Sequence, residues 1–309
     1  MFTRIGTVWR TPRGRAIASH HLEYQRQFYD QHYPRHAAAV REQLAHGLFR
    51  SWNDRVAGRV LDLAAPGPRA GEPLRVYEAG CGEGLIASAL QRMAAERGIA
   101  LAYTGADLSE AALSVAREAL PSGTYLVGDA TSVTAGLAAS SQDVVVAKNL
   151  LHHIDDPGAF LAAARRAVGP SGRIVIVEAR LACVPFFLAT LIFAYERERY
   201  FFQGRRRNLR AIREGGLTIR RHERFSALPF EYALAIRAKV FRRLTAAASP
   251  ITIARITRLD DRLATLLPVL AHYDIWLATP DAAPDGAGPS RGNHEQRGDE
   301  DGHGGDEPA

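Results

Sequence analysis

The sequence predicts an α/β protein built on a doubly wound, mostly parallel sheet of seven strands, with helices before the first strand and a helical insert after the fifth. Two observations lead to this prediction. Short apolar runs alternate with segments of helical periodicity through residues 74–178, and the first of these runs ends in a glycine turn that opens a helix. Parallel strands joined by helices account for both observations.

The first strand and its turn occupy residues 74–84, where an alternating run reaching Ala79 is followed by Gly80, Gly82 and Gly84. These glycines remove side chains where the backbone must approach a ligand. The amide groups that open the next helix, expected over residues 85–93, point at whatever lies there. We therefore predict a ligand site at this turn, although an ordinary glycine-rich α/β turn would have the same composition.

The spacing of the glycines and one acid indicate the kind of ligand. A dinucleotide fingerprint, G-x-G-x-x-G, would need its third glycine at position 85, which is leucine. Glu78 lies two residues before the first glycine, where a carboxylate can accept hydrogen bonds from a cationic amino-acid moiety. The stretch from Glu78 to Gly84 resembles the first motif, E/D-x-G-x-G-x-G, of the class I S-adenosylmethionine (SAM)-dependent methyltransferases, which have a Rossmann-like fold.

A second acid, Asp107, ends the next expected strand, residues 100–106, and Ser109 is placed to cap a helix over residues 110–120. A carboxylate at this distance after a glycine turn is in position to accept the two ribose hydroxyls of an adenosine cofactor. The resemblance to the methyltransferases implies the same role for Asp107, and it adds Leu108 to the cofactor set.

A third acid follows the third expected strand, residues 124–127. The resemblance implies that Asp129, together with Ala130, meets the adenine edge, and it places Asn149 in the cofactor site as well. Each acid taken alone could be a simple helix cap. Three of them after successive strands favour the methyltransferase family.

The fourth strand is predicted over residues 143–147 and the fifth over 173–178, with a helix from Pro157 to about residue 168 between them. The fourth strand runs into His152 and His153, which follow the carboxyl end of a central strand, where ligands bind in open α/β sheets. This block is similar to the corresponding part of small-molecule methyltransferases. The resemblance covers residues 74–178.

One of the two histidines is a candidate general base, because a hydroxyl acceptor must lose a proton and an imidazole titrates near neutrality. Adjacent side chains cannot both face the same way. The sequence leaves open whether His152 or His153 is the base, or whether both are structural, and we expect a buttressing role more readily for His153. Neither this pair nor His20 and His21 indicates a metal, since adjacent histidines are poor co-ligands for one ion and no acid-rich shell surrounds them.

The insert at residues 181–214 combines an apolar segment with Arg205, Arg206 and Arg207. We expect Phe187, Leu191 and Tyr195 to line the pocket of a hydrophobic acceptor. The order of an apolar segment followed by arginines also suits peripheral contact with a membrane surface. After the insert we expect a strand over residues 217–225, helices over 229–245 and 253–267, and a last strand over 272–278.

Composition divides the chain into three parts. Residues 1–73 are expected to form an N-terminal arm and helical cap, residues 74–280 the SAM-binding domain, and residues 281–309 a disordered acidic tail rich in glycine and proline. The net charge of +6 combines a tail of −6 with a body of +12. Two cysteines imply no disulfide framework and favour a reducing compartment, so we expect a cytoplasmic protein.

From these features we predict a SAM-dependent methyltransferase that methylates a hydrophobic or aromatic small molecule on oxygen. Methylation on carbon or nitrogen of a lipid-like or secondary-metabolite acceptor is the first alternative. The basic body raises a second alternative, an RNA methyltransferase, but the arginine bias has a simpler origin in genomic composition, so nucleic acid is not the favoured partner. The third alternative is a non-catalytic SAM-binding partner subunit. Oligomeric state does not follow from the sequence.

Overall fold

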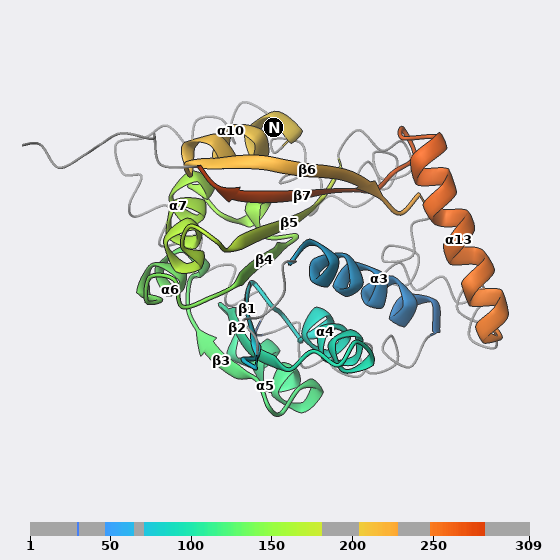
Figure 1. Cartoon of the computed structure of the whole chain (residues 1–309), viewed down its shortest axis with the longest axis horizontal. Helices are drawn as coiled ribbons and strands as arrows, with labels where there is room; N and C mark the ends of the chain where they lie inside the picture. The colour runs from blue at the N-terminus through green and yellow to red at the C-terminus, as the bar shows by residue number, and fades with distance from the viewer. Residues whose placement is uncertain (1–29, 31–46, 65–70, 181–203, 228–247, 282–309) are drawn as a thin grey trace, which may run out of the picture.

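A computed structural model describes residues 30, 47–64, 71–180, 204–227 and 248–281. Its centre is a seven-stranded sheet in the order β3-β2-β1-β4-β5-β7-β6 (Figure 1). Strand β7 runs antiparallel to both β5 and β6, and the other neighbouring strands pair in parallel. The strands are β1 Leu74–Ala79, β2 Leu101–Asp107, β3 Thr124–Val127, β4 Val144–Lys148, β5 Arg173–Ala179, β6 Leu217–Phe225 and β7 Tyr273–Pro280. The predicted fold class, a mostly parallel seven-stranded α/β sheet, is confirmed.

Helices cover both faces of this sheet (Figure 1). They are α3 Gly47–Leu63, α4 Leu85–Glu96, α5 Glu110–Ala119, α6 Ala130–Gly136, α7 Pro157–Val168, α10 Arg205–Glu214 and α13 Pro250–Leu266, with a short 3₁₀ helix η1 at Leu151–His153. Helices α3 and α4 pack with one apolar cluster, and α7 and α10 pack with a second on the other side. The sheet therefore separates two hydrophobic cores.

Strand β4 shows how one sequence pattern serves both cores. Val144 and Val146 belong to the cluster under α3 and α4, whereas Val145 and Ala147 belong to the cluster under α7 and α10. All four are fully buried. A central parallel strand has no solvated face, and this is why its sequence is continuously apolar rather than alternating.

Helices α5 and α7 begin at side-chain caps. The Ser109 Oγ accepts a hydrogen bond from the Ala112 amide at 3.3 Å, and the Asp156 Oδ1 accepts one from Ala159 at 2.9 Å. Helix α13 begins three residues earlier than expected from the sequence. Ser249 caps it by accepting a hydrogen bond from Thr252, and Pro250 fits the first helical position because it has no amide hydrogen to satisfy.

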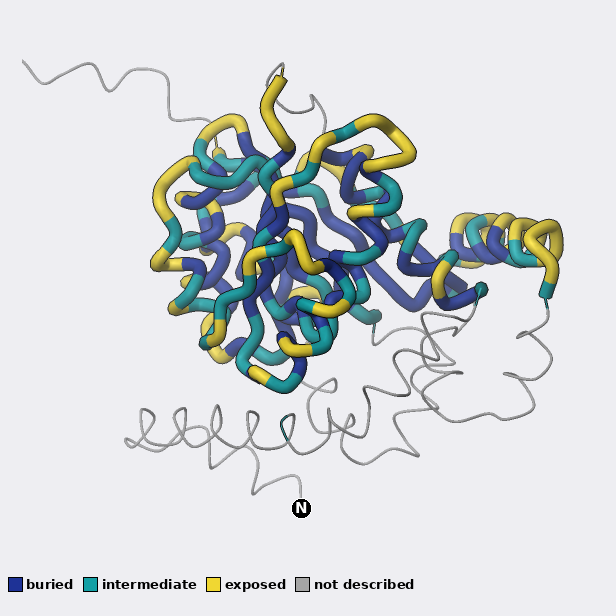
Figure 2. Tube along the Cα trace, turned by 90° about the horizontal axis from the view of Figure 1, so that it is seen from below, coloured by how far each residue is buried: buried dark blue, intermediate teal, exposed yellow. Residues whose placement is uncertain are grey.

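Helix α3 joins the sheet to α13. Its Trp52 packs against Phe225 of β6 and Tyr273 of β7, with ring centroids 5.7 and 5.3 Å apart. On its outer side Arg55 pairs with Asp260 at 2.6 Å and with Asp261 at 2.9 Å. These ion pairs tie α13 to α3. Figure 2 shows α13 projecting from the rest of the described chain.

Several predictions lie outside the described residues: most of the N-terminal arm, the apolar part of the insert at 181–203, the helix at 229–245 and the tail from 282 onward. Within the described part of the chain, none of the helices is both long enough and apolar enough to cross a membrane.

Candidate functional site

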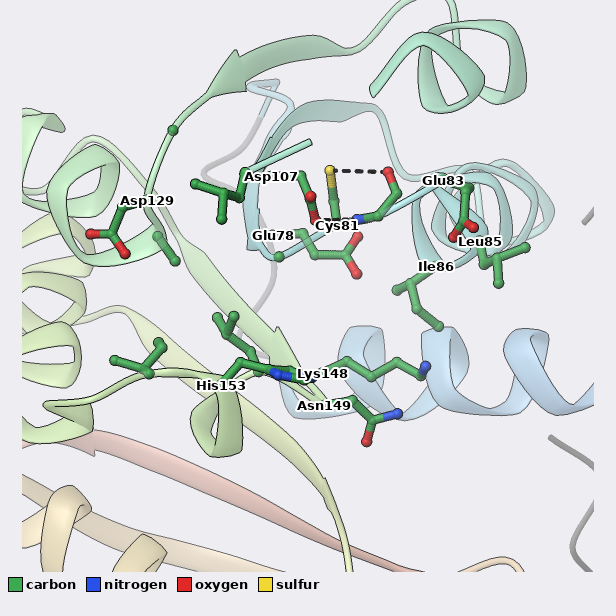
Figure 3. Close-up of a pocket in the computed structure, with 17 residues that line it drawn as sticks. Glu78, Cys81, Glu83, Leu85, Ile86, Asp107, Asp129, Lys148, Asn149 and His153 are labelled. Atoms are coloured by element: carbon green, nitrogen blue, oxygen red, sulfur yellow. Dashed lines mark hydrogen bonds between the residues drawn. The ribbon is translucent and has the colours of Figure 1, made fainter. Parts of the chain in front are cut away.

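A cavity of about 260 Å³ opens at the carboxyl ends of β1, β2 and β4 (Figure 3). This is the edge at which ligands bind in open α/β sheets. The cavity is lined by eight of the nine residues that the sequence predicts for the cofactor: Glu78, Gly80, Gly82, Asp107, Leu108, Asp129, Ala130 and Asn149. The fold thus brings together side chains from four separate loops, although their roles toward a cofactor stay predictions.

The turn after β1 requires its glycines. Gly80, Gly82 and Gly84 have φ angles of 69°, 52° and 73°, a region that other residues rarely adopt. A Cβ on Gly80 would lie 2.8 Å from Cδ1 of Leu150, in the loop after β4. Gly84 does not line the cavity. A Cβ there would lie 3.0 Å from the Cα of Ala116, so this glycine permits the close packing of α4 against α5.

Asp107 holds the β1 turn against the end of β2. Its Oδ2 accepts a hydrogen bond from the Gly82 amide at 2.9 Å, and its Oδ1 accepts one from the Ser109 amide at 3.0 Å. Burial raises the pKa of the Asp107 carboxyl, while these backbone hydrogen bonds act in the opposite direction. The acid predicted for ribose recognition therefore also shapes the glycine turn.

Glu78 is buried, and Tyr103 of β2 donates a hydrogen bond to its Oε2 at 2.6 Å. Burial raises the pKa of the Glu78 carboxyl to about 7, and the Tyr103 hydroxyl and the charge of Lys148 both lower it. Sequence analysis missed Tyr103. The available signal was Gly105 inside a strand, because a Cβ at that position would lie 3.0 Å from the Tyr103 hydroxyl and 2.8 Å from the Cys81 Sγ.

The cavity is rich in acids. Besides Glu78, Asp107 and Asp129 it is lined by Glu83, whose pKa burial raises to about 7. Among the described residues that line it, Lys148 is the one lysine or arginine, and its Nζ lies 5.2 Å from the ring centroid of Trp52. Such a surface suits a cationic ligand better than an anionic one.

Asp129 caps α6 as well as lining the cavity. Its Oδ2 accepts hydrogen bonds from the amide and the hydroxyl of Ser132, at 2.9 and 3.0 Å. The helix-cap role that the sequence allowed for this acid is present in the structure.

The loop after β4 is held by a carboxylate from β5. Oε1 of Glu178 accepts hydrogen bonds from the amides of Leu150 and Leu151 at 2.8 and 2.7 Å, and its Oε2 lies 2.7 Å from Nδ1 of His152. Both side chains are only 3% exposed. The sequence predicts Glu178 only as the end of a strand, and this contact with the loop after β4 is not predicted.

The two histidines have separate places. His152 is the buried partner of Glu178, whereas His153 lines the cavity, with the two ring centroids 4.1 Å apart. The buttressing role that we expected more readily for His153 is seen for His152, through its buried contact with Glu178. The reason is that Glu178 draws the first histidine inward and the 3₁₀ helix turns the next residue outward.

Asn149 precedes this loop in a left-handed conformation, with φ of 50°. Its side chain lines the cavity, and its Oδ1 is buried without a hydrogen-bond partner in the described part of the chain. A buried acceptor of this kind is costly unless something donates to it. The Oδ1 of Asn149 therefore remains available to accept a hydrogen bond, and its predicted role toward a cofactor stays a prediction.

One residue of the N-terminal part reaches this region. The Ser109 hydroxyl donates a hydrogen bond to Oδ1 of Asp30 at 2.6 Å, beside the carboxyl of Asp107. Phe187, Leu191 and Tyr195, predicted for the acceptor pocket, lie outside the described residues. The described residues contain no group of three or more histidines, cysteines or acids arranged to hold a metal ion.

Comparison with known proteins agrees with this geometry. Residues 77–176 match the model of a family described as "Methyltransferase domain". The chain is 38% identical over 103 residues to a ubiquinone biosynthesis O-methyltransferase of Idiomarina loihiensis, covering 32% of this chain and 40% of that protein. It is 36% identical over 113 residues to the protein of the same description from Dinoroseobacter shibae, covering 36% and 42%.

The matched part thus spans about two fifths of the length of these curated relatives. Among solved structures, a TehB-like SAM-dependent methyltransferase from Corynebacterium glutamicum aligns with 81% of this chain and 99% of its own, at 17% identity and a TM-score of 0.48.

Proposed function

We propose that this chain, whose residues 77–176 match a family described as "Methyltransferase domain", is a class I SAM-dependent methyltransferase that transfers a methyl group from SAM to oxygen on a small hydrophobic or aromatic molecule. The single observation that carries the proposal is the acid-rich cavity at the ends of β1, β2 and β4, which unites the glycine turn with Glu78, Asp107 and Asn149.

The residues of the cavity fit SAM by their chemistry. SAM offers hydrogen-bond donors in its ammonium group and its two ribose hydroxyls, and the cavity offers acceptors. Asp107 would hold the ribose hydroxyls, and Glu78 and the buried Oδ1 of Asn149 would accept from the amino-acid part. When bound, SAM supplies a methyl group already activated by the positive charge on sulfur. Leu108, Asp129 and Ala130 are proposed for the adenine side.

The protein then has two tasks, which are to align the acceptor and to manage its proton. Alignment accounts for much of the acceleration in a reaction of this kind, because a positioned pair reacts without the entropic cost of meeting. His153 is the proposed general base, since it is the histidine that lines the cavity. It would take the proton from the acceptor hydroxyl, while the His152–Glu178 contact holds the loop in place.

The acceptor class rests on the two relatives described above and on the apolar insert. Those relatives are described as O-methyltransferases of ubiquinone biosynthesis. We propose that residues 181–214 complete a pocket for a hydrophobic acceptor, with Phe187, Leu191 and Tyr195 in its wall, and that the segment can also touch a membrane surface. Residues 1–73 are proposed as a cap on this domain, and the cytoplasmic location stays a prediction.

The proposal is tested with methyl-labelled SAM and an alkylated dihydroxybenzene as the acceptor probe, followed by extraction into an organic phase. We expect label on a ring oxygen. In His153→Ala, kcat should fall by about 10² or more, because a general base contributes about 10²–10⁴, while SAM affinity measured by calorimetry is unchanged.

Two results would contradict the proposal. SAM binding without label transfer to the probe or to any fraction of a cell extract would indicate a non-catalytic binding subunit. Label entering RNA would favour the nucleic-acid alternative. Equal turnover in His153→Ala and the wild type would exclude His153 as the general base and leave the rest of the proposal standing.

A further inference from the structure

Helix α13 stands out from the body of the molecule, as the tube in Figure 2 shows. Its inner side is fixed. Asp260 is fully buried against Arg55, and Asp261 pairs with both Arg55 and Arg59 of α3, at 2.9 and 3.4 Å. Thr257 and Ala264 are buried on the same side. The orientation of the helix about its own axis is therefore set by specific contacts.

The outer side of α13 is apolar and exposed. Ile251, Leu259 and Leu266 lie on it, and Leu259 and Leu266 are 52% and 74% exposed. Two further exposed residues, Leu267 and Val269, follow the helix directly. Of the large exposed hydrophobic residues in the described part of the chain, five belong to this region and one, Val127, lies elsewhere. Scattered apolar residues need no explanation, but a concentration of this kind marks an interaction surface.

The same side is positively charged. Arg255, Arg258 and Arg262 are exposed, and their spacing of three and four residues interleaves them with the apolar side chains. The two acids of the helix face the opposite way, toward α3. The outer side of α13 therefore presents leucine, isoleucine and arginine with no carboxylate of its own helix among them.

We propose that the outer side of α13 docks on an anionic lipid bilayer. A helix that combines apolar side chains with arginines lies in the plane of a membrane interface, where the apolar groups enter the headgroup region and the guanidinium groups meet lipid phosphates. Pairing of two copies through this face would set arginines against arginines. A nucleic acid would meet the arginines but leave the leucines without a partner.

This inference goes beyond the proposed function and does not depend on it. It concerns residues 250–269, which are different residues from those of the insert at 181–214. Helix α13 is tied to α3, and α3 carries Trp52, whose ring lies 5.2 Å from the Nζ of Lys148 in the cavity wall. Docking through α13 would therefore place the lipid surface next to a helix that contacts α3, and α3 in turn contacts the cavity wall at Lys148.

The test is cosedimentation of the full chain with vesicles of phosphatidylglycerol and phosphatidylcholine, compared with vesicles of phosphatidylcholine alone. We expect binding to the anionic vesicles. The triple variant Arg255→Gln, Arg258→Gln, Arg262→Gln should bind more than about tenfold more weakly, since each basic residue near an anionic surface contributes to binding. The matched triple Arg→Lys variant keeps the charge and should retain most of the binding.

The contribution of the apolar side chains to vesicle binding is tested by a separate pair of variants. Leu259→Ser should lower vesicle binding severalfold, whereas Val127→Ser, at a residue 53% exposed on β3, should leave it unchanged. Equal melting temperatures would show that all variants fold. The proposal is overturned if the wild type ignores anionic vesicles, if the α13 variants bind them as well as the wild type does, or if Leu259→Ser instead dissociates a dimer detected by light scattering.

Discussion

The loops after β1 and β4 line the same cavity, but they are held in place by different means. The β1 turn is shaped by its own backbone, with three glycines at positive φ, and by Asp107 at the end of the next strand. The β4 loop is shaped by Glu178, which reaches it from β5 and accepts two amide hydrogen bonds. Both walls are tied to a carboxylate on a neighbouring strand, but the β1 turn also depends on three glycines at positive φ.

This difference separates the two walls in function as well. The glycine turn is proposed to contact the cofactor. Other residues rarely adopt the positive φ angles of its three glycines, so few substitutions are tolerated there. The β4 loop carries His153 and is held by side chains from other segments: Glu178 accepts the Leu150 and Leu151 amides, and Arg207 donates to the Ile154 carbonyl. The β1 turn and the β4 loop are also in contact, because the Leu150 side chain packs where a side chain on residue 80 would lie.

The largest effect should come from removing the carboxylate behind the β4 loop. In Glu178→Ala two buried amides and His152 lose their acceptor, so we expect the free energy of unfolding to fall by about 3 kcal/mol or more. Urea denaturation measures this. Glu178→Gln keeps one carbonyl acceptor and should lose less. A loss below about 1 kcal/mol in Glu178→Ala would show that the loop is held by other contacts.

A smaller effect is expected at the β1 wall. Asp107→Ala should weaken SAM binding at least tenfold, because losing a hydrogen bond to a charged group costs about 1.5–3 kcal/mol. Calorimetry measures the affinity. The control is Asp107→Asn, which keeps one acceptor and can still receive the Gly82 amide. Unchanged affinity in Asp107→Ala would exclude Asp107 from the cofactor site.

The smallest effect is a pH dependence from Glu78. Its pKa of about 7 lies above the ordinary value of 4.5, so the folded protein binds this proton more tightly than the unfolded chain does. The stability that the proton contributes is full below pH 4.5 and is lost as the pH rises to about 7. SAM, being cationic, should bind the ionised form, so its affinity should rise by about tenfold between pH 6 and pH 8.

Glu78→Gln serves as the control for this pH dependence and should flatten both curves. Glu83, whose pKa is also about 7, would leave a residual slope. Tyr103, Lys148 and Asp107 face the Glu78 carboxyl, and Tyr103→Phe removes a hydrogen bond that lowers its pKa. The midpoint should therefore move to higher pH in that variant. A SAM affinity that does not change between pH 6 and pH 8 would contradict the assignment of Glu78 to the ammonium group.

Local patterns predicted the strands well. β3 and β6 have the bounds expected from the sequence, because the turn residues that bound each strand lie next to it in the sequence. The start of α13 is predicted three residues late, because apolar periodicity starts at Ile253 whereas the helix starts after the Ser249 cap. The acids at the strand ends were found for the same local reason, because each follows its own strand.

Long-range contacts escaped prediction. Tyr103 and Glu78 lie on neighbouring strands, and only the register of β1 and β2 brings the hydroxyl to the carboxylate. The orientation of His152 and His153 depended on Glu178, which no periodicity connects to them. Asp30 reaches Ser109 from the N-terminal part, again through tertiary structure. Sequence patterns therefore located the site, while packing decided which side chains face it.

The place of β7 between β5 and β6 has a consequence for synthesis of the protein. Among the described strands, β6 has β7 as its sole neighbour, and β7 is the last of them to leave the ribosome. Strands β1 to β5 can pair as they emerge, but β5 keeps an open edge and β6 stays without a partner until residues 273–280 are made. Exposed edges pair readily with other chains. A nascent chain that stalls before Tyr273 is therefore the form of this protein most exposed to aggregation.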